Sequence, residues 1–459
     1  MRILQELRLQ FENRQWCLDP DLALIDTILE KHLEIYELVR GDLADLNKDS
    51  AMGRQDSPSV EQIVRAAIFK EMKGLDYRGL EYAQGDSRIC EIFIKLEQRR
   101  PFSFEVLHKY ISKIKPETLK KVLVVVNKVA LEEGIEDLEK LRMDSTVVES
   151  NIHHPTNNSL IWDCIRESQR LLEKLKGMEE GEGVIDYTKQ AKSNHFQINM
   201  AKGEEKTRAL FEKQLRILKR SIRQTEGVFK KLVEKKGKKG KTSGKMAKVR
   251  EELGKLLPLM KKVGVVPKMS ERREIRGEKV PNAEKVYSIY EAHTDIIVKG
   301  AREVEFGHKV NISGGRSSLV LWCEVVDGNP ADTTLFGKTL KEIKEQYAVT
   351  PRDIVTDGGY ASLANLKTAQ DEGVLNVVFN KIVGSLKNIT TSLNMETRLK
   401  KWRSGVEAMI SNIKRGFGIR RCVWKGRERF ESKVLWSVLG YNIRVMTQHF
   451  LRQIELSQA

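Results

Sequence analysis

The sequence predicts an α/β protein in which helices flank a mixed sheet, with an N-terminal all-helical domain and a helical insertion after the first strand. Three observations support this. Apolar residues recur at three- and four-residue steps through residues 1–135 and 160–262. Strand patterns appear near residue 144 and resume after Pro281. From about residue 335, short strands and helices alternate, as they do in sheets covered by helices on both faces.

The N-terminal third divides into two helical segments. Residues 1–56 are predicted to form an amphipathic arm, which either associates with another helix or packs on the next domain. Residues 57–135 are predicted to be a compact helical domain, whose first helix starts at Ser57-Pro58-Ser59 with a hydroxyl cap and a proline. Short basic helices joined by tight turns are typical of a helix-turn-helix DNA-binding domain, and equally of a bundle with a basic surface.

The first strand pattern surrounds an acid. Asp144 lies in LRMDSTVVESN, where the β-branched residues 146–148 follow it. Aspartate is unfavourable inside a strand, so we infer a chemical role for Asp144. The basic insertion, residues 160–262, then interrupts the sheet with long charged helices. Its residues 230–245 hold eight lysines and one acid, a pattern that fits a solvated loop or a contact to DNA.

The remaining sheet, in residues 136–159 and 263–459, places a second acid at a strand end. Strand patterns after Pro281 lead to a hairpin turn at Gly314-Gly315. A helix over 335–347 precedes the buried pair Ile354-Val355, which ends in Asp357-Gly358-Gly359. In such sheets ligands gather at strand ends, so Asp357 is a candidate site residue.

A helix over residues 398–418 supplies the third acid. Apolar residues form one stripe along it, and Arg403, Glu407 and Lys414 fall within about 40° of one another at its edge. A solvated Arg–Glu pair with a nearby lysine would explain this pattern for a helix taken alone. Together, however, Asp144, Asp357 and Glu407 could hold two divalent cations, for which Mg²⁺ prefers few carboxylates plus water and phosphate. Arg403 and Lys414 would then neutralise nearby phosphates.

The overall composition restricts the partner. Lysine and arginine number 81 against 64 acids, and the resulting charge of +17 favours a polyanion, with nucleic acid before membrane. No apolar run of about 18 residues exists, and the charged N-terminus argues against secretion. The five scattered cysteines are typical of reduced thiols, so we expect a cytoplasmic, nucleoid-associated protein.

With these motifs the chain resembles the DDE transposases of bacterial insertion sequences, in particular the ISNCY-like group. The resemblance extends over most of the chain and rests on LRMDSTVVESN, YEAHTDIIVKG, EFGHKVNISGG, DGNPADTTL, IVTDGGYAS and GVEAMISNIKRGFGIRR. It implies a ribonuclease-H-like catalytic domain in which Asp144, Asp357 and Glu407 are the metal-binding acids.

The family signature, Tyr-(2)-Arg-(3)-Glu-(6)-Lys, matches at Arg403, Glu407 and Lys414, whereas Lys400 stands where the family has tyrosine. The resemblance therefore implies DNA contacts by Arg403 and Lys414, and we add their neighbours Lys400, Trp402 and Arg415.

The resemblance also implies a function. The protein would bind terminal inverted repeats, cleave there with Mg²⁺ (Mn²⁺ substituting), and transfer the strand into target DNA as a homodimer or higher oligomer. Two alternatives stay open at this stage: a ribonuclease-H-like nuclease without strand transfer, and an inactive DNA-binding relic.

Overall fold

The computed structural model describes residues 19–47, 57–96, 99–176, 179–237, 244–261, 270–282, 285–298, 304–382 and 384–458. The chain folds into two compact units. Residues 1–149 and 307–459 make the first unit, which holds the sheet, and residues 150–306 make the second. Parts of the predicted arm, residues 1–18 and 48–56, lie outside the described residues.

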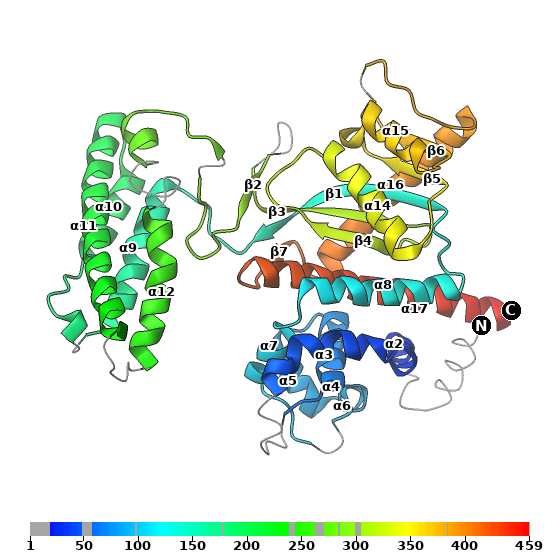
Figure 1. The fold of residues 1–459 in the computed structure, drawn as a ribbon, viewed down its shortest axis with the longest axis horizontal. Helices are drawn as coiled ribbons and strands as arrows, with labels where there is room; N and C mark the ends of the chain where they lie inside the picture. Colours follow the sequence, from blue (N-terminus) through cyan, green and yellow to red (C-terminus); the bar gives the residue numbers. More distant parts are fainter. Residues whose placement is uncertain are drawn as a thin grey trace. The chain divides into compact units, whose positions relative to one another are not determined.

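The first unit is built on a mixed sheet (Figure 1). Strand β1 (Lys140–Ser150) pairs antiparallel with β3 (Glu305–Gly314) on one side and parallel with β5 (Asp353–Thr356) on the other. Beyond them, β4 (Val320–Val325) pairs antiparallel with β3, and β6 (Asn376–Phe379) pairs parallel with β5. The predicted turn at Gly314-Gly315 joins β3 to β4. A two-residue strand absent from the sequence prediction, β7 (Arg421–Cys422), also pairs with β1.

Helices cover both faces of this sheet, which confirms the predicted ribonuclease-H-like fold class. Helices α14 (Thr333–Tyr347) and α15 (Leu363–Asp371) pack on one face, against apolar side chains such as Met143. Helix α16 (Leu393–Gly416) covers β5 and β6 on the other face through Leu399, which packs against Val355 and Val378. Strand alternation puts Asp144 and Val148 on one face of β1, opposite to Met143.

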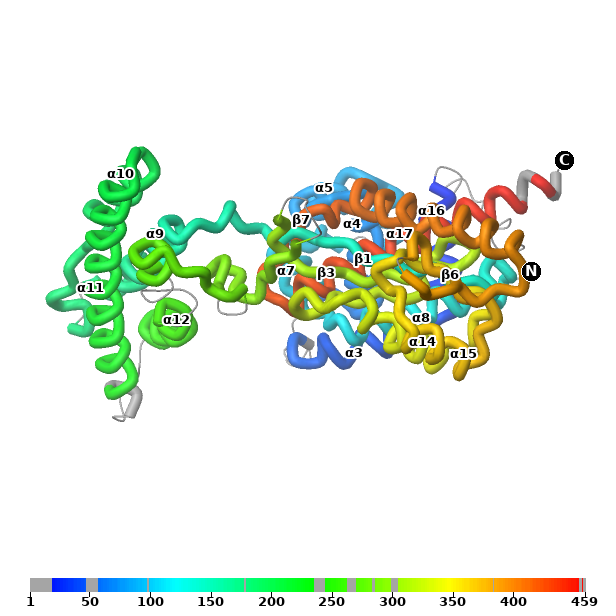
Figure 2. Tube along the Cα trace, turned by 90° about the horizontal axis from the view of Figure 1, so that it is seen from above, coloured from blue at the N-terminus to red at the C-terminus, as the bar shows by residue number. Residues whose placement is uncertain are grey.

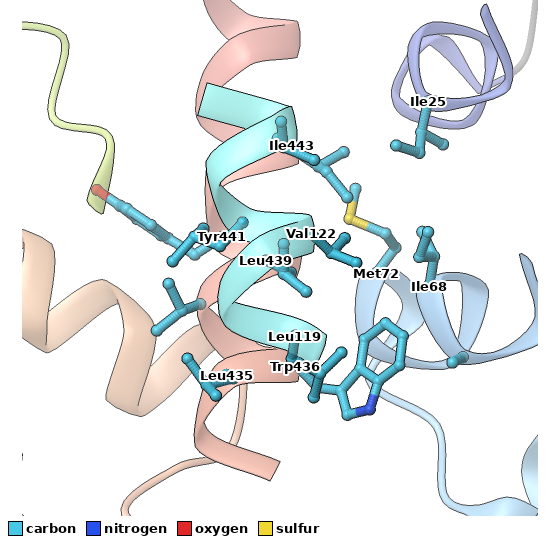
Figure 3. Packing of buried hydrophobic residues seen from close by; sticks show 14 of the residues in the cluster. Ile25, Ile68, Met72, Leu119, Val122, Leu435, Trp436, Leu439, Tyr441 and Ile443 are labelled. Atoms are coloured by element: carbon cyan, nitrogen blue, oxygen red, sulfur yellow. The ribbon is translucent and has the colours of Figure 1, made fainter. Parts of the chain in front are cut away.

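The N-terminal helices share the core of the sheet. Helices α8 (Pro116–Glu132) and α17 (Arg427–Gln458) run side by side, and Figure 3 shows Leu119 of α8 and Trp436 of α17 packing toward Met72 of α4 (Val60–Lys73). Ser59 and Gln62 form a capping box at the start of α4, as the Ser-Pro-Ser start predicted. The remaining helices of this region are α2 (Pro20–Lys31), α3 (Glu34–Asn47), α5 (Tyr77–Asp86), α6 (Arg88–Ile94) and α7 (Phe104–Ile111).

The second unit is a helical bundle with its own core (Figures 1 and 2). Its long helices are α9 (Asn157–Glu173), α10 (Thr188–Met200), α11 (Glu204–Gly237) and α12 (Gly244–Lys261). The lysine-rich run therefore begins as helix, and its residues 238–243 lie outside the described residues. The strand pattern that follows Pro281 in the sequence is wrong for residues 285–294. Only β2 (Asp295–Ile297) is extended, and Ser288 instead accepts turn hydrogen bonds from the backbone of Tyr290 and Glu291.

A membrane span is not among the described elements: no described helix combines the length and apolar character that crossing a bilayer requires.

Candidate active site

Strand β1 carries the first candidate acid at its centre. Asp144 faces Ile312 of β3 in the strand register, and its carboxylate accepts a hydrogen bond from the Ser145 amide at 2.8 Å. The Asp144 side chain is 18% exposed, so an acid within a largely buried strand still reaches solvent on the face that α16 covers.

The second acid, Asp357, follows β5 in a tightly constrained turn. At Gly358, an added Cβ would lie 2.7 Å from the Asn380 carbonyl oxygen, so only glycine fits beside the end of β6. Two residues later, the buried Tyr360 hydroxyl donates to Asn311 of β3 at 2.7 Å. This bond fixes the turn against the strand next to β1. The Asp-Gly-Gly-Tyr motif therefore holds Asp357 at the carboxyl end of β5, near Asp144.

The third acid lies on α16, which the sheet holds through an arginine. Ser392 caps the start of α16, and the buried Arg142 of β1 contacts the middle of this helix. One Arg142 amino group donates to the Trp402 carbonyl at 3.2 Å, and the guanidinium lies 4.8 Å from the centre of the Trp402 ring. The helix can approach this closely because residue 405 is glycine, where an added Cβ would lie 2.0 Å from Arg142.

Arg403 stands between the three acids. Its guanidinium contacts Glu407 at 2.9 Å, Asp144 at 3.4 Å and Asp357 at 3.5 Å. The Arg403 side chain is 9% exposed, whereas the carboxylates of Asp357 and Glu407 are 45% and 62% exposed. Its Nε is buried without a hydrogen-bond partner among the described residues. The structure thus brings the three predicted acids together around one cation.

The donor set fits a hard divalent cation. All three candidates offer carboxylate oxygens, the ligands that such cations prefer. With one guanidinium among them the group carries a net charge of −2, which leaves negative charge to attract a further cation. As the side chains stand, no group of three or more His, Cys, Asp or Glu residues in the described ranges is close enough to hold a metal ion. Arg403 fills the centre that a metal would need.

The other predicted DNA contacts are dispersed along α16. Lys400, in the place of the family's tyrosine, pairs with Glu396 at 2.6 Å. Trp402 is half-buried against Leu399 and lies over Arg142, so its ring helps to attach the helix. Lys414 is partly buried, and Arg415 is exposed at the end of the helix. Of the five, only Arg403 lies among the acids.

Two positioning groups escaped the sequence prediction. Arg142 lies two residues before Asp144 on β1, but its hydrogen bond to α16 spans 260 residues and leaves no local signal. Lys309 of β3 is buried and donates to Asp332 at 3.0 Å, in the segment DGNPADTTL. Asp332 in turn borders Gly359, where an added Cβ would lie 3.1 Å from its carboxylate. The segments EFGHKVNISGG, DGNPADTTL and IVTDGGYAS therefore meet around the turn that carries Asp357.

Comparison with known proteins agrees with this geometry. Residues 299–443 match the family model described as the transposase DDE domain. That region includes Asp357 and Glu407, whereas Asp144 precedes it in the sequence and is separated from it by the helical insertion. No curated protein and no solved structure matches the chain.

Proposed function

We propose that this chain, whose residues 299–443 match the transposase DDE domain, is a DDE transposase that binds the terminal inverted repeats of its own insertion sequence, cleaves there with Mg²⁺ and transfers the strand into target DNA. The family acts on DNA as a cleaving and strand-joining enzyme and generally uses divalent metal ions. The ISNCY-like assignment, the homodimer or higher oligomer and the helix-turn-helix role of residues 57–135 belong to the same proposal. The observation that carries it is the convergence of Asp144, Asp357 and Glu407 on one cation.

In this proposal the three carboxylates hold the metal, and Arg403 is their counter-ion in its absence. A metal held by these carboxylates would activate a water or a 3′-hydroxyl and would stabilise the leaving oxygen. Strand β1 and the turn after β5 fix the two aspartates, while Arg142 fixes α16 and with it Glu407. When a phosphate enters, Arg403 has an alternative anion to bind and can exchange a carboxylate for it.

A nicking assay tests the proposal. Purified protein is incubated with Mg²⁺ and labelled DNA that carries both flanks of its gene. Asp144→Asn, Asp357→Asn and Glu407→Gln each remove a ligand charge, so cleavage should fall about a thousandfold or more, the effect of several kcal/mol at the transition state. Binding of the same DNA should persist.

Glu345→Gln is the matched control for Glu407→Gln, because Glu345 is a helical acid of similar exposure, 58%, on the other face of the sheet. It should cleave like the wild type. Unimpaired cutting by Glu407→Gln would remove Glu407 from the proposal. Cutting without joining of the 3′ end to added target DNA would reduce the function to a nuclease.

A further inference from the structure

The end of α16 opens into a cavity of about 740 Å³ that the acid cluster does not share. Its wall comes from the end of α4, the start of α5, the end of α16 and the start of α17, all within the first unit. Five of its lining residues are lysine or arginine and two are acids. One of those acids, Asp76, is already used to cap α5 through the Gly79 amide. The cavity is therefore strongly positive.

A buried charge cluster lines the cavity. Glu71 lies between two ammonium groups, Lys70 at 2.9 Å and Lys433 at 2.5 Å. All three side chains are largely buried, and one carboxylate cannot balance two cations. Burial alone would raise the pKa of the Glu71 carboxyl, but Lys433 and Lys70 outweigh it and hold that pKa below its usual range; burial also lowers the pKa of Lys433. An added anion would be favoured here, because it would stabilise the charged form of the second ammonium group, which burial disfavours.

Two aromatic rings complete the cavity wall beside the lysines. Tyr77 and Trp424 stack with ring centres 6.0 Å apart, and the Lys70 ammonium lies within 6 Å of both. The Tyr77 hydroxyl is buried and has no hydrogen-bond partner in the described part of the chain. The cavity therefore offers an unused donor as well as charge.

The rim is formed by exposed cations. Arg415, Lys425 and Arg429 are exposed, and none of them forms an ion pair with a described residue. Arg415 lies eight residues beyond Glu407 on the same helix, about 12 Å along its axis. Because one DNA strand rises about 3.4 Å per nucleotide, that distance corresponds to roughly three or four nucleotides.

We propose that this cavity binds a backbone phosphate of the DNA strand three to four nucleotides from the reacting phosphate. The proposal rests on the proposed function for the identity of the ligand as DNA. The chemistry recognised is a phosphate, held by Arg415 and Arg429 at the rim and by the Lys70–Glu71–Lys433 cluster behind them. The cavity would thereby set the distance along the DNA between the part that the N-terminal helices bind and the phosphate at the three acids.

Photo-crosslinking in the full chain tests the position. Val423 lines the cavity and is 61% exposed, so a benzophenone amino acid replaces it. With labelled duplex DNA carrying both gene flanks, we expect a crosslink within about four nucleotides of the cut. The control position is Leu363, 76% exposed on α15, which packs on the other face of the sheet. Equal crosslinking from Leu363, or none from Val423, overturns the proposal.

Salt dependence tests the charge. In the double variant Arg415→Ala with Arg429→Ala, the slope of log DNA-association constant against log salt concentration should become less steep by up to about 1.8. Each lost phosphate contact accounts for about 0.9 of that change in slope. The control pair is Lys341→Ala with Lys367→Ala, two exposed cations on α14 and α15, whose slope should stay nearer to that of the wild type. An unchanged slope in the Arg415 and Arg429 variant overturns the proposal.

Two further outcomes separate this proposal from the proposed function. Cleavage by a protein that shows neither the crosslink nor the slope change rejects the cavity and leaves the transposase activity standing. A crosslink from Val423 without any cleavage keeps the cavity as a DNA site and rejects the activity.

Competition by a free nucleotide tests the ligand. If a nucleoside monophosphate abolishes the crosslink at concentrations that leave overall DNA binding intact, the cavity takes a free nucleotide, which also overturns the proposal.

Discussion

Two arginines in the first unit are buried, and each contacts three carboxylates, yet their environments differ. Arg65, in the N-terminal helices, contacts Asp26 and Glu30 at 2.5 Å and Glu61 at 3.0 Å. It also donates to the Phe93 carbonyl, and a second cation, Lys95, shares Glu30 and Glu61. Every nitrogen of the Arg65 guanidinium is bonded.

Arg403 has the same kind of partners with looser geometry. Two of its three contacts exceed 3.3 Å, its Nε lacks a partner among the described residues, and two of its acids are about half exposed. The comparison teaches that the same residue types can form a fully bonded charge cluster or an incompletely bonded one. Short contacts to every guanidinium nitrogen characterise the Arg65 cluster, and longer contacts, with an Nε that no described residue bonds, characterise the Arg403 cluster.

The largest effect is expected for Arg65→Met. Losing the arginine removes the buried cation from the partly buried carboxylates of Asp26 and Glu61, of which Glu61 keeps Lys95 as a cation, and this should cost about 3–5 kcal/mol of unfolding free energy. Urea unfolding measures it. The exposed Arg88, paired with Glu91 one turn away, provides the control, and Arg88→Met should change stability by less than about 0.5 kcal/mol. Similar losses in both variants would mean that the Arg65 cluster is not a closed structural unit.

Arg403→Met should instead alter metal binding. Removing a positive charge from the centre of three acids should raise the affinity for Mg²⁺ or Mn²⁺ without DNA by about tenfold or more, since 1.4 kcal/mol suffices for that. Unfolding free energy should fall by less than about 1 kcal/mol, because water can solvate the exposed acids.

Calorimetric titration of the full chain checks the Arg403 effect, with Arg403→Lys as the charge-preserving control. That control should bind metal like the wild type. If Arg403→Met binds metal no more tightly and loses as much stability as Arg65→Met, the two clusters are alike and the comparison fails.

Gly405→Ala tests how the looser cluster is held. The new methyl would displace the flexible end of Arg142, which donates to the Trp402 carbonyl and to Ser318. Losing one such bond should cost about 1 kcal/mol and shift α16, with Glu407, away from β1. Thermal unfolding and the nicking assay measure both effects. Gly41→Ala, at a helical position on α3 with open space around it, should leave both measurements near wild type.

The smallest effect concerns acid stability. Contacts to Lys95 and Arg65 outweigh desolvation and hold the pKa of Glu61 below its usual 4.5. A depressed carboxyl pKa stabilises the fold fully above the unfolded-state value, and the contribution disappears as pH falls through the folded-state value. The difference in urea midpoint between wild type and Glu61→Gln should therefore shrink below about pH 4.5. A difference that stays constant down to pH 3 would contradict this assignment.

Local patterns were enough to predict several parts of this molecule. The cap at Ser59, the helix that contains Glu407 and the strand that contains Asp144 depend on neighbouring residues, and the structure contains all three. The residues suggested the three acids as a candidate set, and the family resemblance singled that set out, because its members lie on three separate elements and no local spacing joins them.

What the sequence could not reveal depends on distant contacts. Arg403 was predicted to face phosphates, and its contacts with Asp144 and Asp357 follow only from the packing of α16 on the sheet. Lys433 meets Glu71 across 362 residues, so no periodicity signals that pair. The predicted strand near 285–294 had suitable residue types, but backbone hydrogen bonds to Ser288 make turns there.

The pairing of Glu149 with Gly307 has a consequence for how such a chain can change over generations. These two residues are direct neighbours across β1 and β3, and all 157 residues of the second unit leave and return between them. Apart from the three-residue strand β2, that unit is equivalent for these two strands to a hairpin loop, which two residues can close. Recombination at this point could remove, enlarge or exchange the whole bundle in one genetic event. The strand register, and with it the place of Asp144 five residues upstream, would be inherited unchanged.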